Sequence, residues 1–309
     1  MARDSVICPP LLFTGSRIMH RFLILSLGLL QILLCGCATT LSKGLMEDSV
    51  QSTALSQERG IFPFIGEKLH FSVRHVATKA TLAEAEIRVG QPMVSEDGTH
   101  FIPITGNASS VALARLVMRV DDRIEAYIDP KTWDTMYSFK HLDEKDRNRS
   151  FYVWFWPEEM SASVERHYKG RVAKRDYVLP PGTMDSVAWI YFARLHKFEK
   201  DTRYTWYTFD GWTLNRVTVT LEEENEDVWT ELGFYRCYKL KLLRERSDAI
   251  APQGALSGVF IEPAREVQVP EYELATAWIS DDDKHLPVRF VVNTGIGEFD
   301  LLLDGVESQ

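Results

Sequence analysis

Cysteine is scarce in this sequence of 309 residues, and its placement limits the chemistry of the chain. The four cysteines are Cys8, Cys35, Cys37 and Cys237. Three of them lie at the N-terminus, so the rest of the chain holds one thiol and cannot form an internal disulfide. Cys237 stands in the alternating stretch 234–240, and no basic partner is suggested near it. We therefore expect a buried structural thiol rather than a reactive one.

Motifs that gather catalytic groups or metal ligands are also missing. The sequence has no G-x-S-x-G, no H-E-x-x-H, no Walker loop and no paired His and Cys at metal-binding spacing. Its eight histidines are dispersed. Asp281-Asp282-Asp283 could ligate calcium, but the further spaced carboxylates of a known loop are lacking, so a turn with Asx hydrogen bonds is favoured. We predict no catalytic residues, no metal site and no cofactor, and hence a protein that is not an enzyme.

Positive charge is in short supply. The chain carries 35 Lys and Arg against 44 Asp and Glu, a formal net charge of −9. Nucleic-acid binding calls for a clustered basic surface, so this balance argues against a nucleic-acid partner. It also argues against attachment to anionic lipid by charge alone.

A long apolar run occurs once, near the N-terminus. Residues 22–34 are almost entirely apolar, follow Arg17 and Arg21, and lead into Leu34-Cys35-Gly36-Cys37. The run is short for the ~30 Å hydrocarbon layer of a bilayer, which takes about 20 residues, so a cleaved signal is favoured over a retained helical anchor. Met19 would give a more usual signal start than Met1.

The stretch Leu34–Cys37 resembles the lipobox of bacterial lipoproteins, although Cys35 replaces the usual small or hydroxyl residue. The resemblance implies that Cys37 is lipidated, as palmitoylated lipoproteins are, and becomes the mature N-terminus. Two or three acyl chains at one cysteine hold firmly to a bilayer, whereas one chain binds marginally. Ala38 is not the aspartate associated with inner-membrane retention, so the resemblance implies an outer-membrane lipoprotein facing the periplasm.

Three regions follow from this interpretation. We expect a lipoprotein signal peptide over residues 1–36, a flexible tether over 37–60, and one β domain over 61–309 with a loop insertion near 247–270. Removal of the signal leaves a net charge of about −11.

Period-two alternation of apolar and polar residues dominates the mature part and predicts antiparallel strands. The expected strands are 69–73, 83–89, 101–104, 124–128, 151–156, 164–168, 171–178, 204–209, 212–221, 234–243, 277–280, 288–292 and 298–303. Residues 111–120 also suit a helical turn, and the acidic run 222–227 is expected to be a hairpin turn.

One helix is expected in the mature part, over Ser186–Phe198. Asp185 is a suitable N-cap, and apolar residues recur at helical spacing from Val187 to Leu195. An amphipathic helix must bury its stripe, so we place it against the open face of a curved sheet. Arg194 is expected to tie this helix to a neighbouring strand.

Four blocks are together similar to a bacterial family catalogued as domain of unknown function 3108. They are Gly66–Val73 preceded by Phe62-Pro63-Phe64, then Val120–Asp129, then Asp185–Arg194, and finally Trp278–Asp282 with Leu286-Pro287-Val288 and Gly297. The resemblance runs from about residue 62 to 303, with Thr81-Leu82-Ala83 where a glycine is usual and an insertion after Leu243. It implies an exported, mainly antiparallel β protein without an established activity. The implied fold is a strongly curved sheet or incompletely closed barrel, like periplasmic lipoprotein carriers, with a concave apolar face.

Binding in that concavity is the favoured function. A helix of about 20 Å, at 1.5 Å per residue, is too small to cover a whole apolar sheet face, which leaves room for an apolar or lipid ligand or an envelope protein. Phe151, Phe155 and Trp206 are the candidate ligand-binding residues. The alternatives are a filled barrel that acts as a structural or interaction module and, less favoured, an envelope hydrolase with catalytic groups distant in sequence.

Several aromatic residues permit a further interpretation. Trp154, Trp156, Trp206, Tyr207 and Trp212 could form a sugar-stacking platform. Aromatics at strand spacing more often pack a core or cover a sheet, so the packing role is favoured.

Overall fold

The computed structural model describes residues 59–116, 119–144, 147–247, 272–294 and 297–308. The expected signal peptide, Cys37, nearly all of the tether and nearly all of the loop near 247–270 lie outside the described residues. Among the residues that are described, no helix has the length and apolar character needed to cross a membrane.

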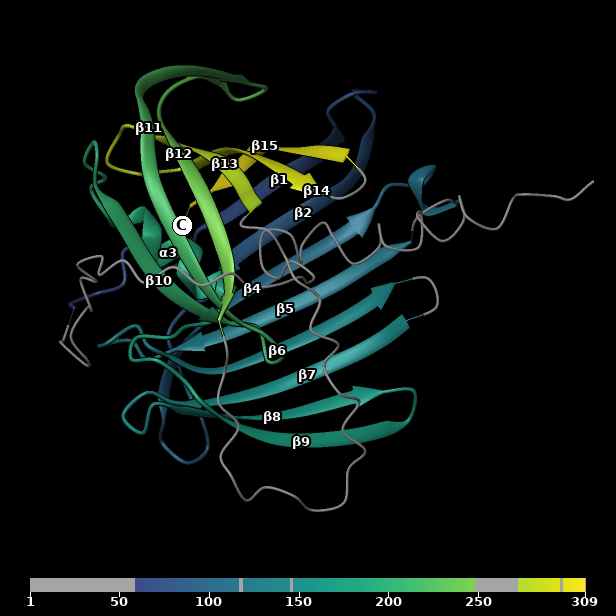
Figure 1. Cartoon of the computed structure of the whole chain (residues 1–309), viewed down its shortest axis with the longest axis vertical. Helices are drawn as coiled ribbons and strands as arrows, with labels where there is room; N and C mark the ends of the chain where they lie inside the picture. The colour runs from purple at the N-terminus through teal and green to yellow at the C-terminus, as the bar shows by residue number, and fades with distance from the viewer. Residues whose placement is uncertain (1–58, 117–118, 145–146, 248–271, 295–296, 309) are drawn as a thin grey trace, which may run out of the picture.

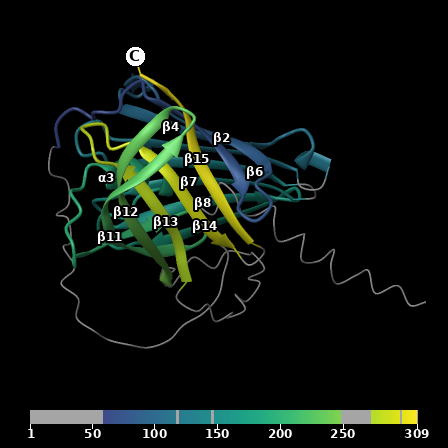
Figure 2. The same cartoon turned by 90° about the horizontal axis from the view of Figure 1, so that it is seen from above.

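Fifteen strands form one antiparallel sheet that bends round on itself (Figures 1 and 2). Its order is β10-β11-β12-β13-β14-β15-β1-β2-β4-β5-β6-β7-β8-β9, with β3 paired to β4. In the described part of the chain the end strands β10 and β9 each pair with one other strand, β11 and β8, so the sheet does not close. The predicted fold, a curved antiparallel sheet or incompletely closed barrel with one principal helix, is confirmed. The strands are β1 (Lys68–His75), β2 (Thr81–Val89), β3 (Met93–Val94), β4 (His100–Ser110), β5 (Val120–Ile128), β6 (Thr135–Glu144), β7 (Arg147–Trp156), β8 (Ser161–Tyr168), β9 (Arg171–Val178), β10 (Arg203–Phe209), β11 (Leu214–Thr230), β12 (Gly233–Ser247), β13 (Tyr272–Ser280), β14 (Pro287–Thr294) and β15 (Gly297–Glu307).

The alternation in the sequence explains which face of the sheet turns inward. In β2, Ala83, Ala85 and Ile87 are buried, whereas Glu84 and Arg88 are exposed. Because paired residues of antiparallel strands point to the same face, one such pattern sets the faces of the neighbouring strands. We call the side with the buried residues the inner face.

The helix α3 (Ser186–Arg194) lies inside the bend, against β4, β5 and β10 (Figure 1). Its buried residues join the larger of two apolar clusters, which is lined mainly by β1, β2, β4, β5 and β10–β15. The helix ends at Arg194 rather than at Phe198. Leu195 caps it, and the chain then tightens, with Leu195 N–H donating to the Phe192 carbonyl and His196 N–H to that of Ala193.

One sequence-based prediction about the strands is wrong, and one long strand was not predicted. The acidic run 222–227 is not a turn but lies within β11, where Lys239 of β12 stands 3.5 to 4.0 Å from Glu222, Glu223 and Glu226. Bulges at Leu221/Glu223 and Glu223/Glu226 let this charged stretch stay paired. The strand β6 was not predicted. The ambiguous stretch 111–120 contains a short 3-10 helix at Ala114–Leu116.

The strands β6–β9 carry a smaller apolar cluster of their own. Its members are Leu142, Phe151, Val153, Phe155, Ala162, Val164, Tyr177, Leu179, Phe209 and Leu214. The turn between β10 and β11 packs directly on this cluster. A Cβ at Gly211 would stand 2.7 Å from Val153 Cγ2, and Gly211 has a φ of +87°, so glycine is required there on both counts.

Candidate functional site

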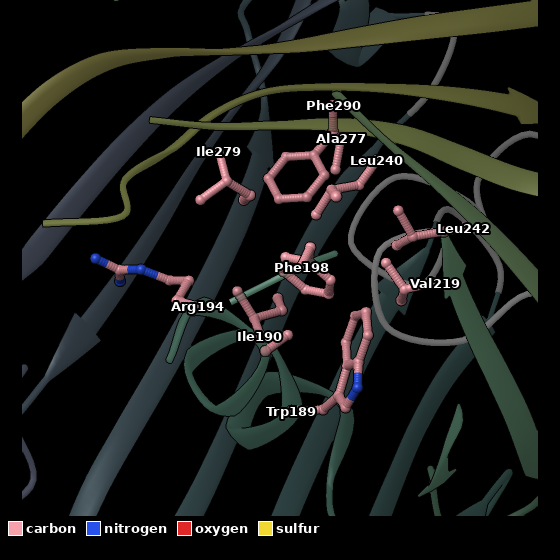
Figure 3. Close-up of a pocket in the computed structure, with 11 residues that line it drawn as sticks. Trp189, Ile190, Arg194, Phe198, Val219, Leu240, Leu242, Ala277, Ile279 and Phe290 are labelled. Carbon is pink, nitrogen blue, oxygen red and sulfur yellow. The ribbon is translucent and has the colours of Figure 1, made fainter. Parts of the chain in front are cut away.

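The interior beside α3 is almost filled. A cavity remains between α3 and strands β11–β14, with about 30 Å³ of space for the centres of water molecules. Since one water needs roughly 10–15 Å³ by this measure, the cavity has room for about two waters and none for an acyl chain. Figure 3 shows its apolar walls, with the Arg194 guanidinium turned away from them. It is lined by Trp189, Ile190, Ala193, Arg194, Phe198, Val219, Leu240, Leu242, Ala277, Ile279 and Phe290.

Arg194 closes one end of this interior with a buried ion pair. Its side chain is 1% exposed, and it donates to both carboxylate oxygens of Glu67 at 2.6 and 2.9 Å. It also donates to the carbonyl oxygens of His285 at 2.8 Å and Lys284 at 3.0 Å. The guanidinium lies over the Phe64 ring, 4.1 Å from its centroid. Arg194 was predicted to tie the helix to a neighbouring strand; its partners are instead Glu67, which directly precedes β1, and the turn residues Lys284 and His285, which precede β14.

A second buried pair lies at the other end of α3. Asp185 caps the helix as predicted, since its Oδ1 accepts a hydrogen bond from Val187 N–H at 2.8 Å. Its Oδ2 lies 3.4 Å from Lys140 Nζ, with both side chains at most 1% exposed. The Asp185 N–H donates to Thr135 Oγ1. These contacts join α3 to β6.

The three predicted ligand-binding residues do not form one site. Phe151 and Phe155 lie together on the inner face of β7, in the smaller cluster, and are 6% and 5% exposed. Trp206 lies in the larger cluster, with its ring edge-to-face against Trp189 at 6.2 Å. Of the three, Phe151 borders a surface that solvent can reach, because the Arg166 guanidinium stands 5.7 Å from its ring.

That surface is rich in arginine. On the inner face of β7–β9, beyond the smaller cluster, stand Arg149, Arg166, Arg171 and Arg175, which we call the arginine face. Arg171 and Arg175 are exposed, and Arg149 and Arg166 are half-buried. The strand register places them together, since Phe151 pairs with Arg166, Arg149 with Tyr168, and Tyr168 with Arg171.

Aromatic rings support the arginine face. Arg166 stands 4.3 Å from the ring centroid of Trp212 and 5.4 Å from that of Tyr168. Trp212 is 49% exposed, so solvent can reach its ring beside the Arg166 guanidinium. Burial raises the pKa of Tyr177 at the edge of this region, while the charges of Arg175 and Arg166 oppose that rise.

Sequence reasoning missed the arginine face. A signal was present, because Arg166, Arg171 and Arg175 all fall at the inner-facing parity of the predicted hairpin 164–178. Alternation shows that these arginines share a face of the hairpin, but it does not show which residues of β7 lie beside them. That requires the register between β7 and β8, which periodicity alone does not provide.

The five aromatics considered as a sugar platform are not on one surface. Trp154 and Trp156 point to the outer face of β7 and are 40% and 42% exposed. Trp206 is buried in the larger cluster, Tyr207 packs on the smaller one, and Trp212 stands beside Arg166. This set therefore divides between two cores and two faces of the sheet.

Other polar residues take the structural roles that were predicted. Cys237 is fully buried, and burial raises the pKa of its thiol to about 12. Asp282 forms an Asx turn, its Oδ1 accepting hydrogen bonds from the N–H groups of Lys284 and His285 at 3.1 Å. Among the described residues, no three His, Cys, Asp or Glu side chains gather as ligands for a metal ion.

Comparisons with known proteins give a family and distant structural likenesses. Residues 70–304 match the family described as "Protein of unknown function (DUF3108)". No curated protein matches this sequence. A crystal structure of a beta-barrel-like protein of the domain of unknown function DUF1849 from Brucella abortus is similar, with a TM-score of 0.47 and 7% identity over 80% of this chain and 98% of that chain.

Two further solved structures are more distant. One is a candidate lipoprotein from Parabacteroides distasonis, with a TM-score of 0.28 and 9% identity over 80% of this chain and 97% of that chain. The other is a candidate exported protein with a YmcC-like fold from Bacteroides fragilis, with a TM-score of 0.28 and 11% identity over 80% and 99%.

Proposed function

The chain belongs to the family described as "Protein of unknown function (DUF3108)", and from this premise we propose that it is a non-enzymatic binding module of the bacterial envelope. In this proposal, lipid on Cys37 anchors the module to the outer membrane, on the periplasmic side. Its ligand is an amphiphilic lipid or an apolar segment of an envelope partner. The binding surface is the inner face of β7–β9 together with Trp212.

The observation that carries this proposal is the division of the inner face into a filled and an accessible part. Over β4, β5 and β10–β14, the inner face is covered by helix α3 and the larger cluster, and the cavity beside α3 has space for about two waters. Helix α3 packs against β4, β5 and β10, whereas the turn between β10 and β11 packs on Phe151 and Val153 of β7. Beyond that turn, inner-facing side chains reach solvent.

The chemistry of the accessible part suits an amphiphile. Trp212 and Tyr168 offer aromatic surface, and the arginine face lies directly beside them. Large aromatic side chains with polar neighbours are typical of surfaces that bind ligands with an apolar and a polar end. The apolar inner residues of β7–β9 are buried in the smaller cluster. The accessible part of this face is therefore a surface of aromatic and charged side chains, not the apolar concavity that was expected.

Mass spectrometry of co-purified molecules tests the proposal. The chain is exported without its lipid anchor, purified without detergent, and extracted with organic solvent. We expect an amphiphilic molecule at near-stoichiometric amount. Trp212→Ala should reduce that amount several-fold, whereas the control Trp229→Ala, which changes an exposed Trp of β11, should not. A clean extract from the unaltered protein would contradict ligand binding.

A second function is favoured by the small size of the cavity. A sheet filled by its own helix can serve as a rigid structural or interaction module without any small ligand. In that case the extract is clean, and crosslinking in intact cells with a photoreactive residue at Trp212 should capture an envelope protein. Capture of lipid instead would favour the first function.

A further inference from the structure

The hairpin of β11 and β12 ends in a group of exposed apolar side chains. Trp229, Leu232 and Phe234 are 73%, 44% and 44% exposed, and Trp229 is the most exposed of the eight tryptophans. The rings of Trp229 and Phe234 are in contact, with their centroids 5.1 Å apart. Single exposed apolar residues are ordinary, whereas a contiguous group marks an interaction surface. We call these three residues the hairpin tip.

The hairpin holds its tip in a fixed place at one end of the bent sheet (Figure 1). Among the described residues, β13 pairs with β12 from Cys237 onward, so the last turn of the hairpin extends past β13. Val228 and Cys237 face inward and are buried, which attaches this part of the hairpin to the larger cluster. Arg74 of β1 donates to Glu231 of the turn at 3.0 Å. The aromatic pair lies on the opposite, outer face, which is the convex side of the sheet.

Charge beside the tip is compensated. Glu231, within the turn, is matched by Arg74. On the same face as the aromatic pair, two positions further from the turn, Asp227 stands opposite Arg236 in the strand register. Apolar side chains bordered by paired charges are suited to a boundary between an apolar and a polar medium.

A lipid surface suits the tip better than a protein does. A stable protein interface takes roughly 800 Å² from each partner, and three side chains on a convex turn offer much less. A bilayer accepts such a group at the boundary between headgroups and acyl chains, where tryptophan is typical. The acidic run 222–227 in the same hairpin disfavours an anionic surface, so the lipid expected is zwitterionic.

The chain between the expected anchor and the described domain is long enough for this contact. Cys37 precedes Arg59, where the described part begins, by 22 positions. Such a length spans about 75 Å when extended, whereas a domain of this size is about 45 Å across. The anchor therefore permits any face of the domain to reach the bilayer. Because it also keeps the domain close to the bilayer, a weak second contact is enough to orient it.

We propose that the hairpin tip inserts into the headgroup boundary of a zwitterionic bilayer and forms a second membrane contact besides the lipid on Cys37. Trp229, Leu232 and Phe234 enter the boundary, and the charged residues beside them stay in contact with water. This inference rests on the proposed attachment through Cys37 and is independent of the ligand surface beside Trp212. Trp229→Ala remains a suitable control in the extraction of the anchor-free chain, because that experiment contains no bilayer.

Fluorescence quenching tests the inference with the full lipidated chain. A nitrobenzoxadiazole dye is attached to a Leu232→Cys variant, which is reconstituted into phosphatidylcholine vesicles containing a lipid with a nitroxide near its headgroup. The dye reacts selectively, because lipid occupies Cys37 in the proposed mature chain and Cys237 is fully buried. The control carries the dye on a Met93→Cys variant. Met93 is 53% exposed and lies beyond the end of β2 that is distant from Arg74.

The expected result is selective quenching at the tip. The nitroxide should quench the dye at position 232 at least about threefold more strongly than the dye at position 93. Addition of Trp229→Ser should reduce the quenching at position 232 at least about twofold, because this ring is the largest apolar group of the tip. The matched variant Trp156→Ser, which changes a Trp that is 42% exposed on β7, should leave the quenching unchanged. Thermal unfolding of each variant checks that it folds.

Two results would overturn the inference while the anchor stands. One is equal quenching at both dye positions in a chain that floats with the vesicles, and the other is equal effects of Trp229→Ser and Trp156→Ser. A chain that does not float would refute the proposed anchor and this inference together. A dye at position 232 that is unquenched in lipid vesicles, but shifts its emission to the blue in native envelope membranes, would identify a protein as the occupant and refute the lipid contact.

Discussion

Arg194 is the largest fully buried side chain among the described residues, and its charge is matched by one carboxylate. Removal of one partner from a buried ion pair leaves the other charge uncompensated, which costs about 3–5 kcal/mol. We expect Arg194→Met to lower the free energy of unfolding by about that amount, with Glu67 left buried. Urea denaturation followed by tryptophan fluorescence measures it.

The double variant Glu67→Gln/Arg194→Met is the control for this pair. It removes both charges, so it should recover a large part of the lost stability. If the double variant were less stable than Arg194→Met, charge compensation would not be what Arg194 supplies. The hydrogen bonds to the carbonyl oxygens of Lys284 and His285 would then be the more important contacts.

We expect His196 to make the stability of the folded protein depend on pH. Burial among Phe192, Tyr204 and Trp206 lowers its pKa below the usual value of 6.5. The unfolded state then binds more protons than the folded state as pH falls through 6.5. Stability is therefore fully present above that pH and is lost below it, by at most about 1.4 kcal/mol per pH unit.

We expect His196→Gln to reduce this loss of stability in acid. Urea denaturation at pH 7.5 and pH 5.5 gives the difference for each protein, and His100→Gln is the control because His100 is exposed. An unchanged difference in His196→Gln would mean that other groups cause the acid sensitivity.

At the scale of the elements, α3 depends on Asp185 in two separable ways. Asp185→Asn keeps an oxygen that can cap Val187 N–H but loses the charge beside the buried Lys140, which we expect to cost about 3–5 kcal/mol, as for the Arg194 pair. Asp185→Ala loses the cap as well, for a further 1 kcal/mol or so. Urea denaturation of both variants should rank them in this order. Equal stabilities would mean that the cap contributes nothing.

The predictions that succeeded at this scale rest on local patterns. Asp185 was identified as an N-cap because capping involves residues two positions apart, and Arg194 because its stem continues the apolar stripe of the helix. The strand around Ala85 follows from alternation within its segment, and the strand around Val153 follows from an unbroken apolar and aromatic run. In these cases the physical cause lies within a few residues of its effect.

The predictions that failed depend on partners distant in the chain. The acidic residues 222–227 stay in β11 because Lys239 of β12 stands opposite them. The arginine face requires the register of three strands, and the filling of the interior requires the placement of α3 over the sheet. Neither follows from the period of one segment. Phe151 and Trp206 were accordingly grouped as one site, although they belong to different clusters.

At the scale of the whole molecule, the sheet has two packed regions, the larger and the smaller apolar cluster, and they differ in how much of the inner face they cover. The larger cluster around α3 supplies most of the buried apolar surface, and thus most of the stability. The smaller cluster holds β6–β9 in shape while part of their inner face reaches solvent. A rigid core beside an accessible polar surface allows binding residues to change without loss of the fold.

The last prediction concerns attachment to the membrane through Cys37, which lies outside the described residues. Apolar residues 22–34, the sequence Leu34–Cys37 and the polar stretch after it occur in the order that a lipoprotein requires. We expect the unaltered protein in the membrane fraction, and a labelled palmitate precursor should be incorporated at Cys37. Cys37→Ala should abolish the label, and the control Cys35→Ala should retain it. Fractionation alone is less decisive, because an uncleaved apolar segment could still hold Cys37→Ala to the bilayer. Incorporation of label into Cys37→Ala would show that Cys37 is not the lipidated residue.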